Sequence, residues 1–484
     1  MKKIATVISA IIILSFSLCF IGCSNQKTNR TSYQIDCTLD GHVLTGKQTL
    51  TFFNSSQTTI KTLKFNLYAN AFRKDAQYSP IGSQYLSRAY PNGLNYGDIK
   101  INSVYQEGWK IEHEVCGQDK NVLSVELKDE VFPDERATVE INYVINLANV
   151  IARTGYNEKT INLANFYPVL CALDGGTFYE CLYYSTGDPY YSDCADYKVT
   201  LTCDKKYTVA SSGKQVSFKE NQNTFTRTYS LSCARSFAFV LSENFECITD
   251  KSTGTEINYY FYNDQNPLKS IEYGIRAIGL FNQKFGEYAY PTYSIVQTPF
   301  IQGGMEFPAL VMISDDLSGL PYGEVIVHET AHQWWQSAVG NNEIEYGFLD
   351  EGLSEYSVVL YYESFPEHGY TRQDLISASE KTFRTFCTVY DKIYNKIDTS
   401  MIRSLKDFSS EYEYVNIAYV KPCIMYDALR NTIGDERFFK ALKRYYSQYK
   451  FKNVQPDDLV GAFEKVGADT NGFFKSFFDG TAII

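Results

Sequence analysis

The pattern of polar and apolar residues changes once along this chain, near residue 265. From about residue 33 to residue 262, short segments rich in Val, Ile, Thr, Tyr and Phe often alternate polar and apolar positions, with Gly, Asn and Asp between them. This pattern is typical of half-buried β-strands. After residue 266, apolar residues recur three and four positions apart, which indicates amphipathic helices. We therefore expect an α+β, multidomain protein with an all-β domain over residues 24–265 and a mostly helical domain over residues 266–484.

The length of the chain fits this division, and its charge narrows the choice of partners. A chain of 484 residues is too long for one ordinary hydrophobic core, so two or three domains are expected. The net charge is −11, from 45 basic and 56 acidic side chains, and the sequence has no arginine-rich arm or basic patch. This balance argues against a nucleic-acid partner.

The first 23 residues have the order of a secretory signal. MKK is followed by the apolar run ATVISAIIILSFSLCFIG, then by Cys23 and the polar stretch SNQKTNRTS. FIGC resembles a bacterial lipobox, although Phe20 stands where Leu is usual. The resemblance implies a signal peptide over residues 1–23, a lipid anchor on Cys23 and a place on the extracytoplasmic face of a bacterial cell membrane. The alternative is an uncleaved anchor helix, because about 19 apolar residues can span a bilayer.

The segment VIVHETAHQWW, residues 325–335, holds two of the five histidines in the chain. We expect one helix over residues 323–339. His328 and His332 would then share a helix face and could bind one metal ion. Glu329 would lie about 100° around the helix from His328, where it could reach a water bound to that ion. The alternative is a pair of core or solvated histidines, and we interpret the tryptophans as packing.

A catalytic zinc also needs a third protein ligand and an open position. Glu351 lies nineteen residues after His332, and a helix–turn–helix can bring it back to the first helix. This spacing and the segments HETAHQWW and LDEGLSEY resemble those of the gluzincin metallopeptidases, in particular the aminopeptidase N family. The resemblance implies a thermolysin-like zinc peptidase domain over residues 266–484. It also implies one Zn²⁺ per chain, held by His328, His332 and Glu351, with Glu329 as general base.

Two further segments are similar to motifs of the same family. In QGGMEFPAL, Gly303, Gly304 and Glu306 match a substrate-binding motif whose glutamate pairs with the free α-amine of a peptide, although Phe307 replaces the family's Asn. Without the resemblance, Glu306 would be an ordinary edge-strand carboxylate.

The second segment is YVKP, which resembles a Tyr-x-Lys-Gly core. It implies that Tyr419 donates a hydrogen bond to the oxyanion, with Tyr414 as a competitor. Pro422 replaces the Gly, which suits a helix only if Pro422 lies in its first turn. Glu355, one helical turn after Glu351, could accept a hydrogen bond from a metal-bound imidazole.

Together these residues predict a zinc-dependent aminopeptidase that acts on peptides with a free N-terminus. The segment GDPYYSDCADYKV is also similar to the family's β-domain. Many members continue into a helical C-terminal domain, so we expect a short form without it and a more open cleft. Two alternatives stay open: a zinc endopeptidase with an open cleft, and a non-catalytic peptide-binding lipoprotein.

Overall fold

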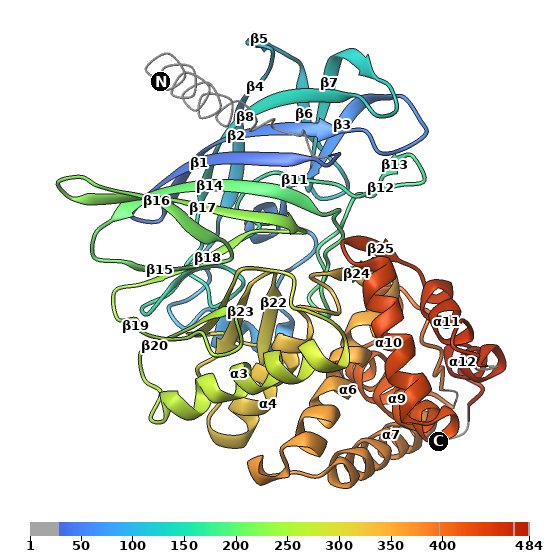
Figure 1. Ribbon diagram of the computed structural model, residues 1–484. Helices are drawn as coiled ribbons and strands as arrows, with labels where there is room; N and C mark the ends of the chain where they lie inside the picture. Colours follow the sequence, from blue (N-terminus) through green and yellow to red (C-terminus); the bar gives the residue numbers. More distant parts are fainter. Residues whose placement is uncertain (1–28, 396, 468–469, 483–484) are drawn as a thin grey trace, which may run out of the picture.

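The computed structural model describes residues 29–395, 397–467 and 470–482 (Figure 1). The predicted signal segment, with Cys23, lies outside these residues. Within them, no helix combines the length and the apolar character needed to cross a membrane.

The N-terminal half consists of β-sheets, as the alternating pattern predicts. Strands β1 (Ser32–Asp40) and β2 (Val43–Phe53) alternate buried and exposed positions along most of their length, so one face of their sheet packs on the core. β1 pairs in parallel with β14 (Ala195–Asp204) and antiparallel with β2. The largest sheet has eight strands in the order β16 (Lys214–Glu220), β17 (Thr224–Ala234), β14 (Ala195–Asp204), β1 (Ser32–Asp40), β2 (Val43–Phe53), β8 (Arg136–Asn146), β4 (Asp98–Gln106) and β5 (Trp109–Lys110).

Two four-stranded sheets and a hairpin complete this half. The first has the order β15 (Thr208–Ser211), β18 (Ala238–Ser242), β10 (Ile161–Ala164), β9 (Thr154–Tyr156). The second has the order β11 (Val169–Leu170), β3 (Ile60–Asn66), β7 (Val122–Val131), β6 (His113–Cys116). The hairpin pairs β12 (Leu173–Asp174) with β13 (Thr177–Phe178), and the short helices are η1 (Tyr68–Phe72), η2 (Ser83–Tyr85) and α2 (Leu86–Ala89).

A five-stranded sheet connects the two halves of the chain. Its order is β19 (Glu246–Asp250), β20 (Glu256–Phe261), β21 (Thr292–Thr298), β23 (Leu310–Ser314), β22 (Gly304–Phe307), with β22 antiparallel to β23 at the edge. The helices α3 (Pro267–Lys284) and α4 (Gly319–Ala331) pack against each other and against strands of this sheet. Because β19 and β20 precede residue 265, the sheet contains chain from both sides of the predicted domain boundary.

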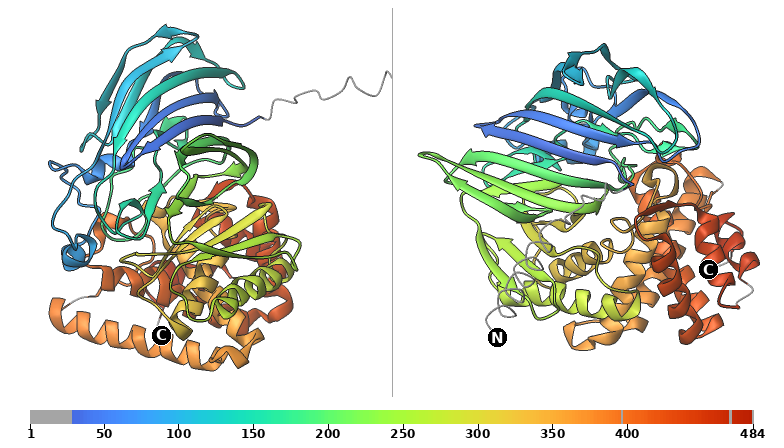
Figure 2. Two further views of the ribbon diagram at one scale, coloured as in Figure 1. Left: turned by 90° about the vertical axis from the view of Figure 1, so that its left-hand side faces the viewer. Right: turned by 45° about the horizontal axis from the view of Figure 1, so that its top comes forward.

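The C-terminal half is mostly helical, as predicted, and its helices lie together below the N-terminal sheets (Figure 2). Helix α6 (Phe348–Ser364) packs against α4 and α9 (Lys421–Ile433), and its first turn lies at the end of α4. A short parallel pair joins β24 (Val339–Asn341) to β25 (Lys452–Val454). The remaining elements are α5 (Glu343–Tyr346), α6 (Phe348–Ser364), η3 (Pro366–His368), α7 (Arg372–Tyr394), η4 (Leu405–Asp407), α8 (Glu411–Val415), the π-helical turn η5 (Asn416–Val420), α9 (Lys421–Ile433), α10 (Asp435–Tyr449), α11 (Pro456–Glu464) and α12 (Asn471–Phe478).

The helix predicted over residues 323–339 is shorter in the structure, and this corrects the sequence prediction. Helix α4 ends at Ala331, and turns follow until β24 begins. Trp334 and Trp335 are both fully buried, and Trp334 donates from its indole nitrogen to the carbonyl of Gly286 at 2.7 Å. Neighbouring positions on a helix face different directions, so a break in the helix allows both indoles to enter the core.

The structure also shows where Pro422 lies relative to the start of its helix. The π-helical turn η5 precedes α9, which begins at Lys421, so Pro422 occupies the first turn of α9. The backbone stays helical from α8 through η5 into α9, and the missing N–H of Pro422 follows directly after the π-helical turn, where the regular α-helical hydrogen bonds are already interrupted. A Cβ on Gly352 would lie 2.5 Å from Cβ of Pro422, so this glycine lets α6 approach the proline closely.

Candidate metal centre

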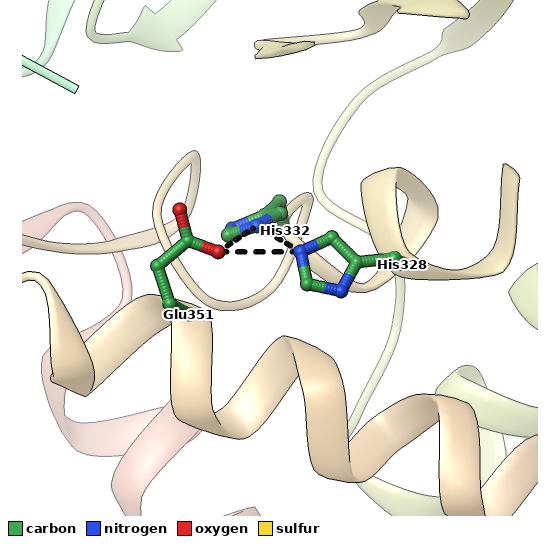
Figure 3. Close-up of side chains that lie close together, drawn as sticks. All are labelled: His328, His332 and Glu351. Atoms are coloured by element: carbon green, nitrogen blue, oxygen red, sulfur yellow. Dashed lines mark hydrogen bonds and ion pairs between the residues drawn. The ribbon is translucent and has the colours of Figure 1, made fainter. Parts of the chain in front are cut away.

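Three side chains from the ends of two helices converge on one point (Figure 3). Helix α4 supplies His328 in its last turn, and His332 follows immediately with helical backbone angles. The first turn of α6 supplies Glu351. Nε2 of His328 lies 3.0 Å from Nε2 of His332 and 3.2 Å from Oε2 of Glu351, and the His332–Glu351 distance is 3.1 Å.

This triangle of donor atoms fits a single metal ion. A tetrahedral zinc ion with bonds of about 2.0–2.1 Å needs ligand atoms roughly 3.3 Å apart, close to the distances found. Two imidazoles and a carboxylate with an open fourth position are a donor set of catalytic zinc sites. One oxygen or nitrogen of each residue lies within 4.8 Å of those of the other two. The residues that the sequence predicts as zinc ligands are therefore brought together.

The other ring nitrogens of both histidines have hydrogen-bond acceptors. Nδ1 of His332 donates to the carbonyl of Trp335 at 3.0 Å, and Nδ1 of His328 donates to Oε2 of Glu355 at 3.2 Å. These bonds select the tautomer that leaves Nε2 free to bind a metal. The contact between His328 and Glu355 is the one that the sequence predicts.

Without a metal, the histidines and Glu351 shift one another's pKa values so that protonated imidazoles face an ionised carboxylate. Burial lowers the pKa of His332, but the carboxylates of Glu351 and Glu306 outweigh burial and raise this pKa to about 10. Burial alone would raise the pKa of Glu351, but the imidazoles of His332 and His328 hold it well below its usual range. A metal ion that binds here must therefore displace protons from the imidazoles.

Tyr419 is placed directly against the metal ligands. Its hydroxyl donates to Oε1 of Glu351 at 2.5 Å, and its ring stacks 5.8 Å from that of His328. The π-helical turn η5 carries this side chain. Tyr414 also lines the cleft, with its ring against those of Phe408 and Tyr419. Of the two tyrosines that the sequence leaves open, Tyr419 is the one that contacts a metal ligand.

Two buried carboxylates beside the triangle lack partners. Glu329 on α4 and Glu306 on β22 are 5% and 4% exposed, and each has one oxygen without a hydrogen bond to any described residue. Burial raises the pKa of Glu306 well above its usual value and raises that of Glu329 to about 7. A Cβ on Gly304 would lie 2.4 Å from Oε1 of Glu329, so this glycine makes room for the carboxylate. Gly303, in contrast, lies against Val325.

These residues line a cleft of about 520 Å³ between the N-terminal sheets and the helices. The N-terminal half contributes Arg153 and Asp188, which form a buried ion pair at the cleft wall. Sequence reasoning missed both residues. Asp188 lies in the GDPYYS segment that the sequence analysis quotes, so its motif was visible but its role was not. Arg153 stands in no motif.

A buried arginine of the N-terminal half also holds the segment that follows His332. Nε of Arg235 donates to the carbonyl of Gln336 at 2.8 Å. Its other nitrogens donate to the carbonyls of Ser192 and Lys452, at 2.8 and 2.6 Å, and to the side chain of Asn453. One guanidinium therefore connects three separate parts of the chain just behind the carbonyl that orients His332.

Comparisons with known proteins agree with this geometry. Residues 269–478 match the model of the peptidase family M1 domain. Aminopeptidase N from Haemonchus contortus is 22% identical over 401 residues, which cover 75% of this chain and 39% of that protein. Aminopeptidase M1-D from Oryza sativa subsp. japonica is 26% identical over 216 residues, which cover 41% of this chain and 24% of that protein. The chain thus spans well under two thirds of the length of either relative.

Solved structures show the same fold over nearly the whole chain. An M1 zinc metallopeptidase from Deinococcus radiodurans matches with a TM-score of 0.66 at 16% identity and covers 94% of this chain and 95% of that chain. A mutant of an M1 zinc metallopeptidase from the same organism, bound to a Tyr-Ser-Ala substrate, matches with a TM-score of 0.64 at 15% identity and the same coverage. The predicted α+β architecture, with a β-domain before a mostly helical region, is confirmed.

Proposed function

Because the chain belongs to the M1 peptidase family, we propose that it is a zinc-dependent aminopeptidase that removes the first residue of peptides with a free N-terminus. The observation that carries this proposal is the triangle of His328, His332 and Glu351, with the unpartnered carboxylates of Glu329 and Glu306 beside it. One Zn²⁺ per chain is part of the proposal. When bound, zinc polarises a substrate carbonyl and lowers the pKa of a water.

Each side chain has a position that suits one task. Glu329 accepts the proton of the attacking water and returns it to the leaving amine, because a carboxylate with a pKa near 7 can do both near neutral pH. Tyr419 donates its hydroxyl to the developing oxyanion. Glu306 binds the α-ammonium group of the substrate, since a buried carboxylate without a partner gains most from a cation.

The experiment is hydrolysis of a panel of aminoacyl substrates by the purified chain, with and without a zinc chelator. We expect release of the N-terminal residue that the chelator abolishes and added zinc restores. Each peptide is also offered with an acetylated N-terminus, which removes the ammonium group. If acetylated peptides are cut internally as fast as free ones, the activity is that of an endopeptidase and Glu306 does not bind an amine.

A non-catalytic binding protein is a weaker candidate, because His328, His332 and Glu351 converge and Glu329 lies close to His332. Zinc-loaded protein that cuts no peptide of the panel would favour it.

The place of the protein in the cell is a separate proposal that rests on the sequence alone. We propose export and attachment to the extracytoplasmic face of a bacterial membrane through a lipid on Cys23. Mass spectrometry of the mature N-terminus tests it, with Cys23→Ser as the variant. A mature chain that keeps residues 1–22 would contradict the proposal.

A further inference from the structure

A second group of acidic side chains lies next to the metal centre. Glu306 on β22, Glu343 at the start of α5 and Asp350 in the first turn of α6 each place one oxygen within 4.8 Å of the other two. We refer to these three residues as the carboxylate cluster. All three are at least 96% buried. Glu306 alone of the three lines the cleft, so the cluster lies behind the cleft wall.

The cluster has fewer hydrogen-bond donors than its oxygens can accept. Oε1 of Glu343 accepts from the side chain of Gln336 at 2.9 Å, and Oδ1 of Asp350 accepts from that of Asn341 at 2.9 Å. Oε2 of Glu343 and Oε1 of Glu306 are buried and accept from no described residue. A buried carboxylate oxygen without a donor is costly unless a cation compensates it.

No described lysine or arginine forms an ion pair with the cluster. The ion pairs of the described residues include none with Glu306, Glu343 or Asp350. Asp188, Glu329 and Glu351 are buried in the same region, and Arg153 is the arginine paired with one of these carboxylates.

We propose that the carboxylate cluster binds a second cation, a hard divalent ion of the Ca²⁺ type, distinct from the metal held by the two histidines. The donors are oxygens only, which suit Ca²⁺, Mg²⁺ or Mn²⁺ better than zinc. Ca²⁺ sheds its waters and accepts an irregular cage with Ca–O distances of about 2.3–2.6 Å, whereas Mg²⁺ usually keeps several waters. A buried site built from three carboxylates therefore favours Ca²⁺.

The site would have a consequence for the substrate, which rests on the proposed aminopeptidase function. Glu306 belongs both to the cluster and to the cleft wall. A cation bound to its buried side holds this carboxylate ionised and in one orientation, ready for the α-ammonium group. Calcium should therefore lower the KM for peptides with a free N-terminus and leave kcat nearly unchanged.

Calcium binding to the zinc-loaded full chain is measured by isothermal titration in metal-free buffer, with zinc counted by elemental analysis before and after. We expect one calcium ion per chain, with a Kd between about 10⁻⁷ and 10⁻³ M, the range of calcium sensors and extracellular calcium-binding modules. Glu343→Gln should weaken binding at least tenfold and leave the zinc content unchanged. Glu345→Gln is the matched control, because Glu345 lies on the same short helix but contacts Tyr179 instead of the cluster.

The outcomes separate this site from the proposed function. No calcium binding at millimolar concentration, or equal binding by the wild type and by folded Glu343→Gln, would overturn the second site whatever the activity. Circular dichroism and the melting temperature show whether the variant is folded. If Glu343→Gln is unstable, Asp350→Asn replaces it. Calcium binding that depends on Glu343 in a protein that cuts no peptide would support the site and contradict the aminopeptidase proposal.

Discussion

Replacing Glu329 by Gln should have two opposite effects: it should lower kcat, and it should raise the stability of the metal-free protein. The two side chains have nearly the same size, so the fold and the ligands His328, His332 and Glu351 are preserved. Glutamine cannot accept a proton from water, and positioned acid–base groups contribute about 10²–10⁴ in rate. We expect kcat to fall by that factor, which corresponds to roughly 3–5 kcal/mol of transition-state stabilisation.

The same change should stabilise the metal-free protein. Burial raises the pKa of Glu329 from 4.5 to about 7 in the folded state. Below pH 4.5 the group is protonated in both states and has no effect. As pH rises toward 7 the unfolded chain ionises first, so the folded protein loses stability, in total about 3 kcal/mol at 1.36 kcal/mol per pKa unit. Glutamine removes this loss, and the variant should be more stable at pH 8 by up to about 3 kcal/mol.

The assay combines steady-state kinetics of the zinc-loaded proteins with urea unfolding of the metal-free proteins at pH 4.5 and pH 8. Glu324→Gln is the control, because Glu324 lies on the same helix and lines the cleft, and burial raises its pKa only to about 6. It should keep its turnover and gain less stability. A zinc-loaded Glu329→Gln protein with near wild-type turnover refutes the assignment of the base. A variant that is less stable than wild type at pH 8 refutes the argument from burial.

Three further changes test the surroundings of the metal. Gly304→Ala should keep zinc but lower kcat about 10²-fold, because its Cβ would collide with Glu329 and displace this catalytic group. Gly303→Ala is the control, since its Cβ would only touch Val325 at 3.3 Å. Comparable kcat values for the two variants would argue against this steric role. Tyr419→Phe should lower kcat by about 10²–10³ with little change in KM, while Tyr414→Phe should not; the reverse order would make Tyr414 the oxyanion donor. Glu355→Gln should weaken zinc binding about 10–100-fold in a competition titration with a chelator, and an unchanged affinity would show that its bond to His328 is dispensable.

The meeting of His328, His332 and Glu351 could be predicted from sequence because its geometry is local. The spacing of His328 and His332 places both on one helix face, and the helix–turn–helix that follows needs only to return Glu351 to it. The structure brings Glu351 against both histidines although α4 ends at Ala331. His332 keeps helical backbone angles, so the shorter helix does not change the ligand geometry.

The parts that could not be predicted depend on contacts between distant segments. Arg153 and Asp188 come from separate loops of the N-terminal half, and although Asp188 lies in the GDPYYS segment, no pattern in the sequence pairs it with Arg153 at the cleft wall. Glu343 looks like an ordinary helix-start glutamate until the fold places it beside Glu306. The end of α4 was also missed, because it depends on how the two tryptophans pack in the core rather than on helix propensity.

The contacts of Arg235 have a consequence for the order in which the protein matures. Domains generally fold as they leave the ribosome, N-terminal first. The segment after His332 is fixed by β24 pairing with β25 and by Arg235 donating to Lys452, and both partners emerge more than a hundred residues after the ligand itself. The nascent chain therefore has all three ligands long before it has the scaffold that fixes one of them. If the three residues bind zinc as proposed, we expect loading to be completed only after Lys452 has joined the fold.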